Sequence, residues 1–417
     1  MIETKYSGAP WIGSIPIDWN ILRFKDKFEN KKEIAGNNSV KYERLALTLN
    51  GVVKRSKSDD DGLQPKAFDT YQILRKNDFV FKMIDLQNIS TSRVGLSQYT
   101  GLVSPAYIRF SPKEENLVTK YTYYFLMSMY YNCVFNNLGG DGVRSALNSS
   151  DMGSLMIPWP NRLEQIRIAD FLDDKLSKID ALITNQQQQI EKLKQYKQSL
   201  ITEVVTKGLN KNVAMKDSGV DWIGEVPREW KLEKIKYVAI IRDEKYEGGD
   251  YEYIALENVE SLSGRYVKTD STYDLEGTKL AYSGDVIFGK LRPYLGKALS
   301  IDHEYCVSTE FAVFSPKKLT SEYLKYVLLS YGFIEIINAS TYGTKMPRAN
   351  IDFIKNVIVP IPTKKEQDDI VAEAIRIDNS LQRLIDIKLS KIEKLNQYKK
   401  SLIYEYVTGK KSVLLHD

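Results

Sequence analysis

Two stretches of this sequence, about half its length apart, are nearly identical: EKLKQYKQSLITEVVTKG (residues 191–208) and EKLNQYKKSLIYEYVTGK (residues 393–410). Apolar residues recur in both at spacings of three and four, which predicts amphipathic helices. Each helix is expected to end near a glycine, Gly208 or Gly409, because glycine readily adopts the left-handed conformation of a helix C-cap. The chain therefore carries the same helical segment twice.

The repeat extends to a block rich in Trp, Pro and Gly that opens each half. SGAPWIGSIPIDW (residues 7–19) matches SGVDWIGEVPREW (residues 218–230) at an offset of 211, whereas the helices match at an offset of 202. The stretches between match more weakly, as in NDFVFKM (residues 77–83) and GDVIFGK (residues 284–290). A plain duplication with drift is one interpretation. Drift should erode helices and loops alike, however, so the pattern favours a shared frame that presents two different surfaces.

Each half is predicted to be a mixed α+β globule followed by a long helix. Short runs rich in Val, Ile, Phe and Tyr that end at Ser-Pro indicate strands. A helix is expected at about residues 120–132 in the first half and 321–338 in the second, and a short strand ending in Pro-x-Pro closes each globule. The predicted domains are the globules 1–162 and 211–364 and the helical spacers 163–210 and 365–417.

A heptad seam is predicted after each Pro-x-Pro. Gln186 and Lys197 interrupt the first seam, Lys388 and Lys399 interrupt the second, and polar breaks of this kind often fix register or partner choice. The segment 176–204 would span about 40 Å as a helix. Two helices packed on each other are favoured over one helix packed on each globule. The residues assigned to this seam and to partner binding are Ile190, Leu193, Leu200, Ile392, Leu395 and Leu402.

Composition bounds the class of protein. The 417 residues are 43% hydrophobic and 27% charged, as in ordinary globular proteins of two to three domains. The formal charge of +5 and the pI of 8.7 permit a nucleic-acid partner but are not strongly basic. Two cysteines in different halves and two histidines argue against zinc sites and disulfide frameworks, and fit a reducing cytoplasm. We expect neither a signal peptide nor a membrane-spanning helix.

The whole chain resembles type I restriction–modification specificity subunits. The similarity is carried by the paired helices, the paired W-I-G-x-x-P-x-x-W blocks, VSPAY (residues 103–107), VSTEF (residues 307–311) and GDVIFGKLRPYLGK (residues 284–297). The resemblance implies an α+β fold with two tandem mixed α/β target-recognition domains. Two long helices would separate these domains, form an antiparallel coiled coil and relate the halves by pseudo-twofold symmetry.

The same resemblance implies a function and a set of partners. Each globule would read one half of a split target in double-stranded DNA, and the helices would dock two modification (methyltransferase) subunits. S-adenosylmethionine would be bound by those partners, and ATP with Mg²⁺ by restriction and translocase subunits, so that no cofactor is expected on this chain. Two half-sites on one face of DNA lie about 34 Å apart, which suits a helix pair of about 40 Å.

Basic loops that contain glycine are the candidate DNA contacts. The loops 138–151 and 341–352 occupy equivalent places, and their Arg and Asn side chains could pair with guanine and adenine. The loop 289–297 could neutralise phosphates, while its counterpart in 81–95 departs from it. Solvated surface loops are the alternative, and Tyr42, Arg44, Tyr251 and Tyr253 are set aside as core or rim residues. The assigned DNA-binding residues are Lys82, Arg93, Arg144, Asn148, Lys290, Arg292, Tyr294, Lys297, Lys345, Arg348 and Asn350.

No catalytic or metal site is predicted on this chain. GDVIFGKL (residues 284–291) nearly fits a phosphate-binding loop, but Leu291 replaces the hydroxyl residue that would bind Mg²⁺. A non-catalytic DNA-recognition subunit is therefore favoured. A pseudo-twofold adaptor that never contacts DNA and a self-sufficient DNA enzyme with unfamiliar catalytic residues are the alternatives. The basic loops and the divergence of the two halves argue against the adaptor.

Overall fold

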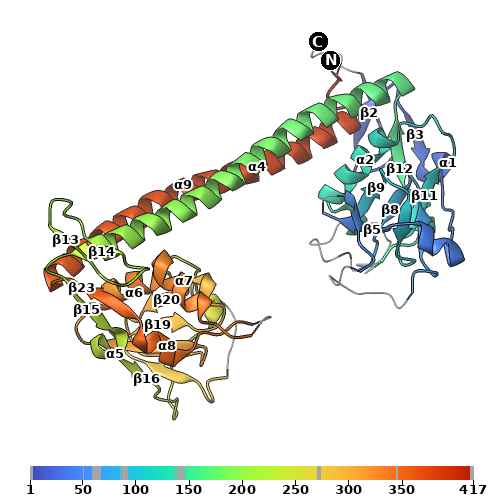
Figure 1. Cartoon of the computed structure of the whole chain (residues 1–417). Helices are drawn as coiled ribbons and strands as arrows, with labels where there is room; N and C mark the ends of the chain where they lie inside the picture. Colours follow the sequence, from blue (N-terminus) through green and yellow to red (C-terminus); the bar gives the residue numbers. More distant parts are fainter. Residues whose placement is uncertain are drawn as a thin grey trace. The chain divides into compact units, whose positions relative to one another are not determined.

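The computed structural model divides into two compact units (Figure 1). Unit 1 comprises Met1–Thr184 and Lys391–Asp417, and unit 2 comprises Asn185–Ser390. Each unit contains a globule, one end of helix α4 (Arg162–Lys207) and one end of helix α9 (Lys364–Val407). The structure describes residues 3–49, 51–58, 67–84, 86, 93–136, 138, 146–269, 274–343 and 346–413.

Unit 1 is built on two four-stranded sheets. One sheet is antiparallel with the strand order β4-β11-β8-β9. The other has the order β6-β5-β10-β7, in which β10 runs parallel to β5 and antiparallel to β7. Helix α2 packs on β9 and buries Tyr121, Phe125 and Leu126, as the apolar run in this segment predicts. The elements are β1 (Thr4–Tyr6), β2 (Ser14–Pro16), β3 (Asn20–Arg23), α1 (Phe24–Lys27), β4 (Phe28–Glu29), η1 (Gly36–Lys41), β5 (Arg44–Thr48), β6 (Gly51–Arg55), β7 (Gln72–Leu74), β8 (Phe79–Phe81), β9 (Val94–Leu96), β10 (Gly101–Val103), β11 (Ile108–Pro112), α2 (Thr119–Tyr131), η2 (Val134–Asn136), α3 (Ser149–Gly153) and β12 (Met156–Trp159).

Unit 2 repeats this topology. Its antiparallel sheet has the order β16-β22-β19-β20, and in its second sheet β21 runs parallel to β17 and antiparallel to β18. The described residues of unit 2 contain no counterpart of strand β6. The duplication predicted from the sequence is therefore confirmed in strand order and direction. The elements are β13 (Met215–Asp217), β14 (Glu225–Pro227), β15 (Lys231–Lys234), α5 (Ile235–Val238), β16 (Ala239–Arg242), β17 (Glu252–Ile254), η3 (Leu256–Asn258), β18 (Lys279–Ala281), β19 (Val286–Gly289), η4 (Pro293–Leu295), β20 (Ala298–Ser300), β21 (Tyr305–Val307), β22 (Phe311–Pro316), α6 (Ser321–Leu329), α7 (Tyr331–Ala339), α8 (Ile351–Asn356) and β23 (Ile358–Ile361).

The single helix expected at residues 321–338 is instead two helices, α6 and α7. Ser330 between them has an extended backbone (φ −65°, ψ 146°), and its hydroxyl donates to the carbonyl of Val327. The freed backbone N–H of Tyr331 donates to Oγ1 of Thr202 on α4, at 2.8 Å. The break thus lets the first turn of α7 bind α4, which the apolar periodicity alone did not indicate.

Each Trp/Pro/Gly block binds the start of a long helix. In unit 1, Nε1 of Trp19 donates to Glu164 near the start of α4, at 3.1 Å. In unit 2, Nε1 of Trp230 donates to Glu366 near the start of α9, also at 3.1 Å. Glutamates in a first helical turn also suit the helix dipole. The matching blocks of the sequence therefore make matching contacts.

Each globule also binds the end of the helix that starts in the other repeat. In unit 1, the hydroxyl of Tyr121 donates to the carbonyl of Val407, near the end of α9, at 3.1 Å. In unit 2, the hydroxyl of Tyr323 donates to the carbonyl of Val205, near the end of α4, at 2.8 Å. Both tyrosines are fully buried, and burial raises the pKa of each phenol. The two repeats thus exchange helix ends.

A glycine follows each long helix, and the packing of the helix end on the globule explains why. Gly409 has φ +69°, and a Cβ on it would lie 2.3 Å from Pro16. Gly208 has φ +70°, and a Cβ on it would lie 3.0 Å from the ring of Trp230. Side chains rarely adopt this conformation, and a Cβ would overlap Pro16 at Gly409 and be in tight contact with Trp230 at Gly208. The helix ends and the Trp/Pro/Gly blocks match across the repeat because they contact each other.

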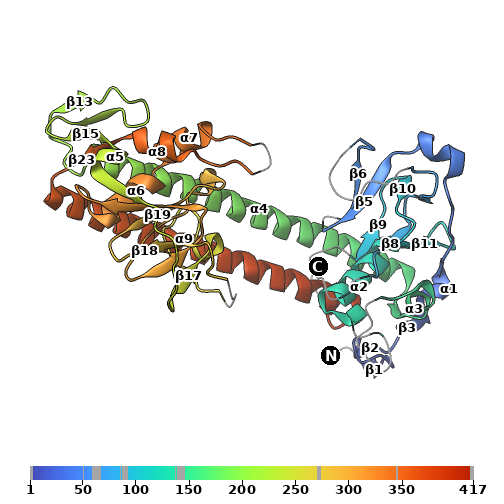
Figure 2. The same cartoon turned by 90° about the horizontal axis from the view of Figure 1, so that it is seen from below.

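Within each unit, α4 and α9 lie side by side and run antiparallel (Figure 2). In unit 1, Nζ of Lys399 donates to both carboxylate oxygens of Asp180, at 2.6 and 2.9 Å. In unit 2, Nζ of Lys197 donates to Asp378 at 2.8 Å, and both side chains are buried. The early part of one helix therefore faces the late part of the other, as the resemblance predicted.

The assigned seam residues lie along this contact. Ile190 and Leu402 are buried, whereas the other four are half-buried. In the last turns of α4 the most buried apolar positions are Ile201 and Val205, which belong to the core of unit 2. The buried positions there differ from the predicted seam positions because the end of α4 packs on a globule as well as on α9. The half-buried seam residues are Leu193, Leu200, Ile392 and Leu395.

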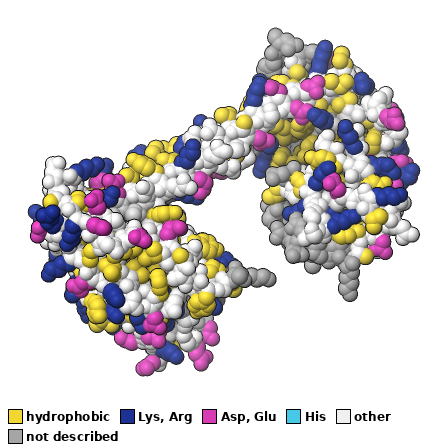
Figure 3. Space-filling view, in the orientation of Figure 1, with side chains coloured by type: hydrophobic (Ala, Val, Ile, Leu, Met, Phe, Trp, Pro, Cys, Tyr) yellow, Lys and Arg dark blue, Asp and Glu magenta, His cyan; other side chains and the backbone are white. Residues whose placement is uncertain are grey.

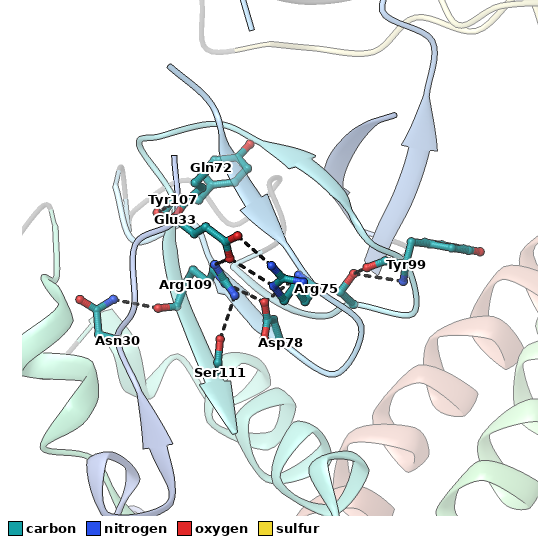
Figure 4. Close-up of polar contacts among 10 residues, drawn as sticks. Asn30, Glu33, Gln72, Arg75, Asp78, Tyr99, Tyr107, Arg109 and Ser111 are labelled. Carbon is teal, nitrogen blue, oxygen red and sulfur yellow. Dashed lines mark hydrogen bonds and ion pairs between the residues drawn. The ribbon is translucent and has the colours of Figure 1, made fainter. Parts of the chain in front are cut away.

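A buried ion-pair cluster ties strand β11 of unit 1 to the turn before β8 (Figure 4). Asp78 accepts from Nε of Arg109 at 2.6 Å and from the backbone N–H of Arg75 at 2.7 Å. Burial raises the pKa of Asp78, while hydrogen bonds from Arg75 lower the pKa of Glu33. In unit 2, Asp285 makes the corresponding turn contact, because its carboxylate accepts from the backbone N–H of Tyr282 at 3.0 Å. These carboxylates are structural because their acceptor sites are occupied by the frame itself.

Candidate nucleic-acid interface

A basic pocket of about 550 Å³ lies in unit 2, between the edge of the antiparallel sheet and helix α8. Lysines from three elements and one loop line it, and the one carboxylate in the lining, Asp243, is paired with Lys279 at 2.6 Å. Burial, aided by the ammonium of Lys279, lowers the pKa of Lys290. An anion in the pocket would relieve this repulsion. The lysines are Lys236, Lys279, Lys290 and Lys355.

The two loops of unit 2 assigned to DNA meet beside this pocket. The backbone N–H of Arg292 donates to the carbonyl of Pro347 at 2.7 Å, and that of Ala349 donates to the carbonyl of Lys290 at 2.9 Å. Arg292 and Tyr294 are exposed on the first loop, and Arg348 is exposed on the second. Loops about 50 residues apart in the sequence therefore present their basic side chains on one surface.

Other assigned residues of unit 2 are held by the protein itself. Nζ of Lys297 donates to the carbonyls of Leu256 and Val259, at 2.7 and 2.8 Å, and burial lowers its pKa. Arg348 forms a two-bond ion pair with Glu310, which raises its pKa. Lys297 would have to break both bonds to reach DNA. Arg348 could exchange a carboxylate for a phosphate without a change of geometry.

Asn148 and Asn350 occupy the same structural position. Oδ1 of Asn148 accepts from the backbone of Ser150 and Asp151 at the start of α3, and Oδ1 of Asn350 accepts from Asp352 at the start of α8. Both are therefore N-caps, a role for which asparagine is favoured. Both are also exposed. Their side chains could serve the local helix, a base, or both.

Unit 1 brings the described parts of the equivalent loops together. The backbone N–H of Leu147 donates to the carbonyl of Met83 at 2.9 Å. Lys82 is half-buried, and Arg93 is buried with its guanidinium donating to the carbonyl of Ile84. Arg93 therefore supports the loop from inside. Arg144, in the same region, and Lys345 of unit 2 lie outside the described residues.

A basic groove in unit 1 was not assigned from the sequence. It has a volume of about 580 Å³ and is formed by η1 and the β5–β6 hairpin. The one carboxylate among its lining residues, Glu43, is bonded to Lys54 at 2.7 Å. The signal was present in KYER (residues 41–44) and VVKRSK (residues 52–57), but Arg44 was set aside as a core or rim residue, and it is in fact buried among the residues that line the groove. The basic residues of the groove are Lys41, Arg44, Lys54, Arg55 and Lys57.

Charge elsewhere is mixed. On the face drawn in Figure 3, basic and acidic side chains alternate over each unit without forming one continuous basic stripe. This agrees with the modest formal charge of +5. Local concavities such as the unit 1 groove and the unit 2 pocket are places where cations are concentrated and could attract a polyanion.

A second groove, of about 660 Å³, runs beside the C-terminal end of α4 in unit 2. Polar side chains of α4 line one side of it, and Trp222 and Tyr331 line the other. Nε1 of Trp222 is buried and has no hydrogen-bond partner among the described residues. At the matching place in unit 1, Nε1 of Trp11 is likewise buried without a hydrogen-bond partner among the described residues, and Tyr404 and Lys410 donate to the carbonyl of Ile12. This groove is a candidate surface for a protein partner.

The described parts of the chain contain neither a cluster of three potential metal ligands nor a helix that could cross a membrane.

Comparison with known proteins places the duplicated globules in one class, the DNA-specificity domains. The sequence model for the type I restriction modification DNA specificity domain matches residues 16–192 and 227–397. The chain therefore belongs to the family of type I restriction–modification specificity subunits.

Curated relatives match over most of their length. The type I restriction enzyme MjaVIII specificity subunit of Methanocaldococcus jannaschii is 24% identical over 95% of this chain and 93% of its own. The EcoDI specificity subunit of Escherichia coli is 20% identical over 92% and 87%. A solved chain from work on complex assembly and conformational transition of the type I R-M system aligns with a TM-score of 0.69 at 15% identity, covering 95% of this chain and 99% of that one. That likeness supports the fold.

Proposed function

We propose that this chain is the sequence-reading and assembly subunit of a type I restriction–modification complex, and that each globule reads one half of a bipartite DNA target. One observation carries the proposal. The two units share a frame, yet they carry their basic concavities on different elements, the β5–β6 groove in unit 1 and the α5–β16–α8 pocket in unit 2. Two unlike readers on one frame suit a target with two unlike halves.

The long helices serve assembly in this proposal. They dock two methyltransferase subunits, and restriction and translocase subunits join through the complex. S-adenosylmethionine, ATP and Mg²⁺ belong to those partners, so that this chain is a non-catalytic, cytoplasmic component. The polar groove beside α4 supports a protein partner on the helices.

An adaptor that never contacts DNA explains less. An adaptor would have no use for two basic concavities in which cations outnumber carboxylates, because such surfaces favour phosphates. It would also have no reason to place them on different elements of the two repeats. DNA recognition accounts for both features.

The test is to combine the purified chain with the methyltransferase encoded beside it and to map methylated adenines on DNA by single-molecule sequencing. We expect a split motif with two unlike halves, of which one changes when one globule is replaced by that of a relative. The methyltransferase alone should methylate no defined motif. Methylation or cleavage by this chain alone would contradict the proposal, as would a stable, active complex without any motif.

A further inference from the structure

The middle of the helix pair in unit 2 contains a polar contact between residues that correspond in the two repeats. Nζ of Lys388 on α9 donates to Oε1 of Gln189 and lies 3.4 Å from Oε1 of Gln186 on α4. Gln186 is buried and Lys388 is half-buried. Gln186 and Lys388 are related by the 202-residue offset of the helices. Corresponding residues of an antiparallel pair can meet only at its twofold axis, so the axis passes through this contact.

The repeats differ in charge at this axis. The positions of Gln186 and Gln189 in α4 are occupied by Lys388 and Lys391 in α9. An antiparallel pair of two α4 segments would therefore gather four glutamines at its centre. A pair of two α9 segments would gather four lysines there.

The ion pairs on either side of the centre do not distinguish a pair of two α4 segments from a pair of two α9 segments. Lys197 of α4 binds Asp378 and lies 3.4 Å from Gln382, and the position of Gln382 corresponds to Asp180 of α4. A second α4 would thus offer Lys197 a carboxylate. Lys399 of α9 binds Asp180, and a second α9 would offer it Asp378 in the same way. Self-pairing thus keeps a carboxylate near Lys197 and near Lys399, whereas the central lysines oppose it in α9.

We propose that the centre of the helix pair selects its partner. A segment that bears Gln186 accepts either the segment that bears Lys388 or a second copy of itself, whereas the segment that bears Lys388 rejects a second copy of itself. Glutamine amides both donate and accept hydrogen bonds, so glutamines satisfy one another. Ammonium groups only donate, and their repulsion is stronger in a partly buried seam than in water. A polar residue at a core position of a coiled coil selects partners by this principle.

The partner that this surface fits is therefore a second copy of the first repeat, residues 1–207. The inference depends on the helix contacts and not on DNA binding, so the two can fail separately. If the proposed DNA function also holds, paired first repeats would carry two copies of one reader.

The first test uses the intact chain and a change in one helix. Gln186→Lys places an ammonium against Lys388, and we expect the unfolding midpoint to fall by about 3 °C in calorimetry. The exchange Gln186→Lys with Lys388→Gln should recover most of that loss, because an ammonium again faces an amide. The control is Gln187→Lys, the same change at an exposed neighbouring position. The proposal is overturned if Gln186→Lys costs no more than this control or if the exchange fails to recover the midpoint.

The second test measures partner choice directly. A protease site placed at residues 209–213, which are exposed between α4 and β13, allows the folded full chain to be cut into its two repeats. After unfolding and refolding of the cut chain, native mass spectrometry should find mixed dimers and first-repeat dimers. Second-repeat dimers should be about tenfold rarer. Lys388→Gln with Lys391→Gln should raise them to the level of first-repeat dimers, whereas the exposed change Lys394→Gln should not. Equal amounts of both self-paired dimers in the unaltered protein, or no first-repeat dimers, would overturn the proposal.

Discussion

Unit 1 and unit 2 differ most where their shared frame meets solvent. The antiparallel sheets have the same strand order, yet β6 of unit 1 has no counterpart among the described residues of unit 2. Conversely, Lys355 on α8 lines the basic pocket of unit 2, and its counterpart on α3 is Gly153. A hairpin in one unit and a lysine in the other thus create cationic concavities at different places. Recognition can change at such positions without disturbing the contacts that build the frame.

The contact between the helices is the part of the frame whose loss should have the largest effect. Leu193→Asp together with Leu395→Asp places a carboxylate in the half-buried seam of each unit. Desolvation of these charges should cost about 3 kcal/mol or more of unfolding free energy and prevent binding of the methyltransferase. Calorimetry and size-exclusion chromatography would measure the two effects.

The matched control for this change is the pair Leu182→Asp and Leu389→Asp. Both of these leucines lie on the same helices but are exposed, at 45% and 50%, outside the seam. These variants should remain close to the unaltered protein in stability and assembly. Equal effects from both pairs would mean that the seam does not lie where the structure places it.

The glycines at the helix ends test whether the two units bind those ends equally tightly. Gly409→Ala should destabilise unit 1 by about 3 kcal/mol, because its Cβ overlaps Pro16 and the left-handed backbone is strained. Gly208→Ala should cost about 1–2 kcal/mol, since its nearest neighbour, the ring of Trp230, is farther away. Denaturant unfolding with local probes in each unit would rank them. A larger loss for Gly208→Ala would reverse the comparison.

The sequence was sufficient to predict the parts of the fold that repeat. Duplicated helices, their polar interruptions and the paired Trp/Pro/Gly blocks predicted two helices packed on each other and two α+β globules, because period and repetition are visible along the chain. The antiparallel direction of the helices was implied by the resemblance to the family. The break at Ser330 was missed, since apolar spacing continues through it and the contact that it allows, between Tyr331 and Thr202, joins residues far apart in the sequence. The sequence also did not predict the two-bond ion pair between Arg348 and Glu310.

The candidate site was less predictable than the fold. The sequence assigned Lys290, which the structure places in the basic pocket of unit 2. It also assigned Arg93, whose burial depends on how the following strand folds back. The groove in unit 1 was missed because η1 and the β5–β6 hairpin bring together cations that look like scattered rim residues in the sequence. Concavity is a property of tertiary structure, and charge spacing alone does not report it.

The two basic concavities should affect DNA binding separately. Lys41→Ala with Lys57→Ala removes two ammonium groups from the unit 1 groove, and Lys290→Ala with Lys355→Ala removes two from the unit 2 pocket. Each pair should weaken binding of the assembled complex about tenfold and reduce the salt dependence by about two phosphate contacts. Fluorescence anisotropy at several salt concentrations would measure both quantities.

Altered DNA targets would then assign each concavity to a half-site. Changing the bases of one half should cost less in the variant that has already lost the matching concavity. Lys211→Ala, at an exposed position outside both concavities, serves as the control. If the pocket variant loses no affinity, the basic surface of unit 2 is an ordinary solvated surface.

The smallest expected effect on stability separates two roles for the equivalent asparagines. Asn350→Ala removes the cap of α8 and should cost about 1 kcal/mol of unfolding free energy. Asn350→Asp keeps a capping oxygen and should leave stability unchanged, but it loses the amide N–H that could donate to adenine. If Asn350 reads a base, the aspartate variant should methylate its motif with relaxed preference at one position, by about 1–3 kcal/mol of discrimination. If both variants keep the full motif, Asn350 only caps α8, and the same pair of changes at Asn148 would show whether unit 1 follows unit 2.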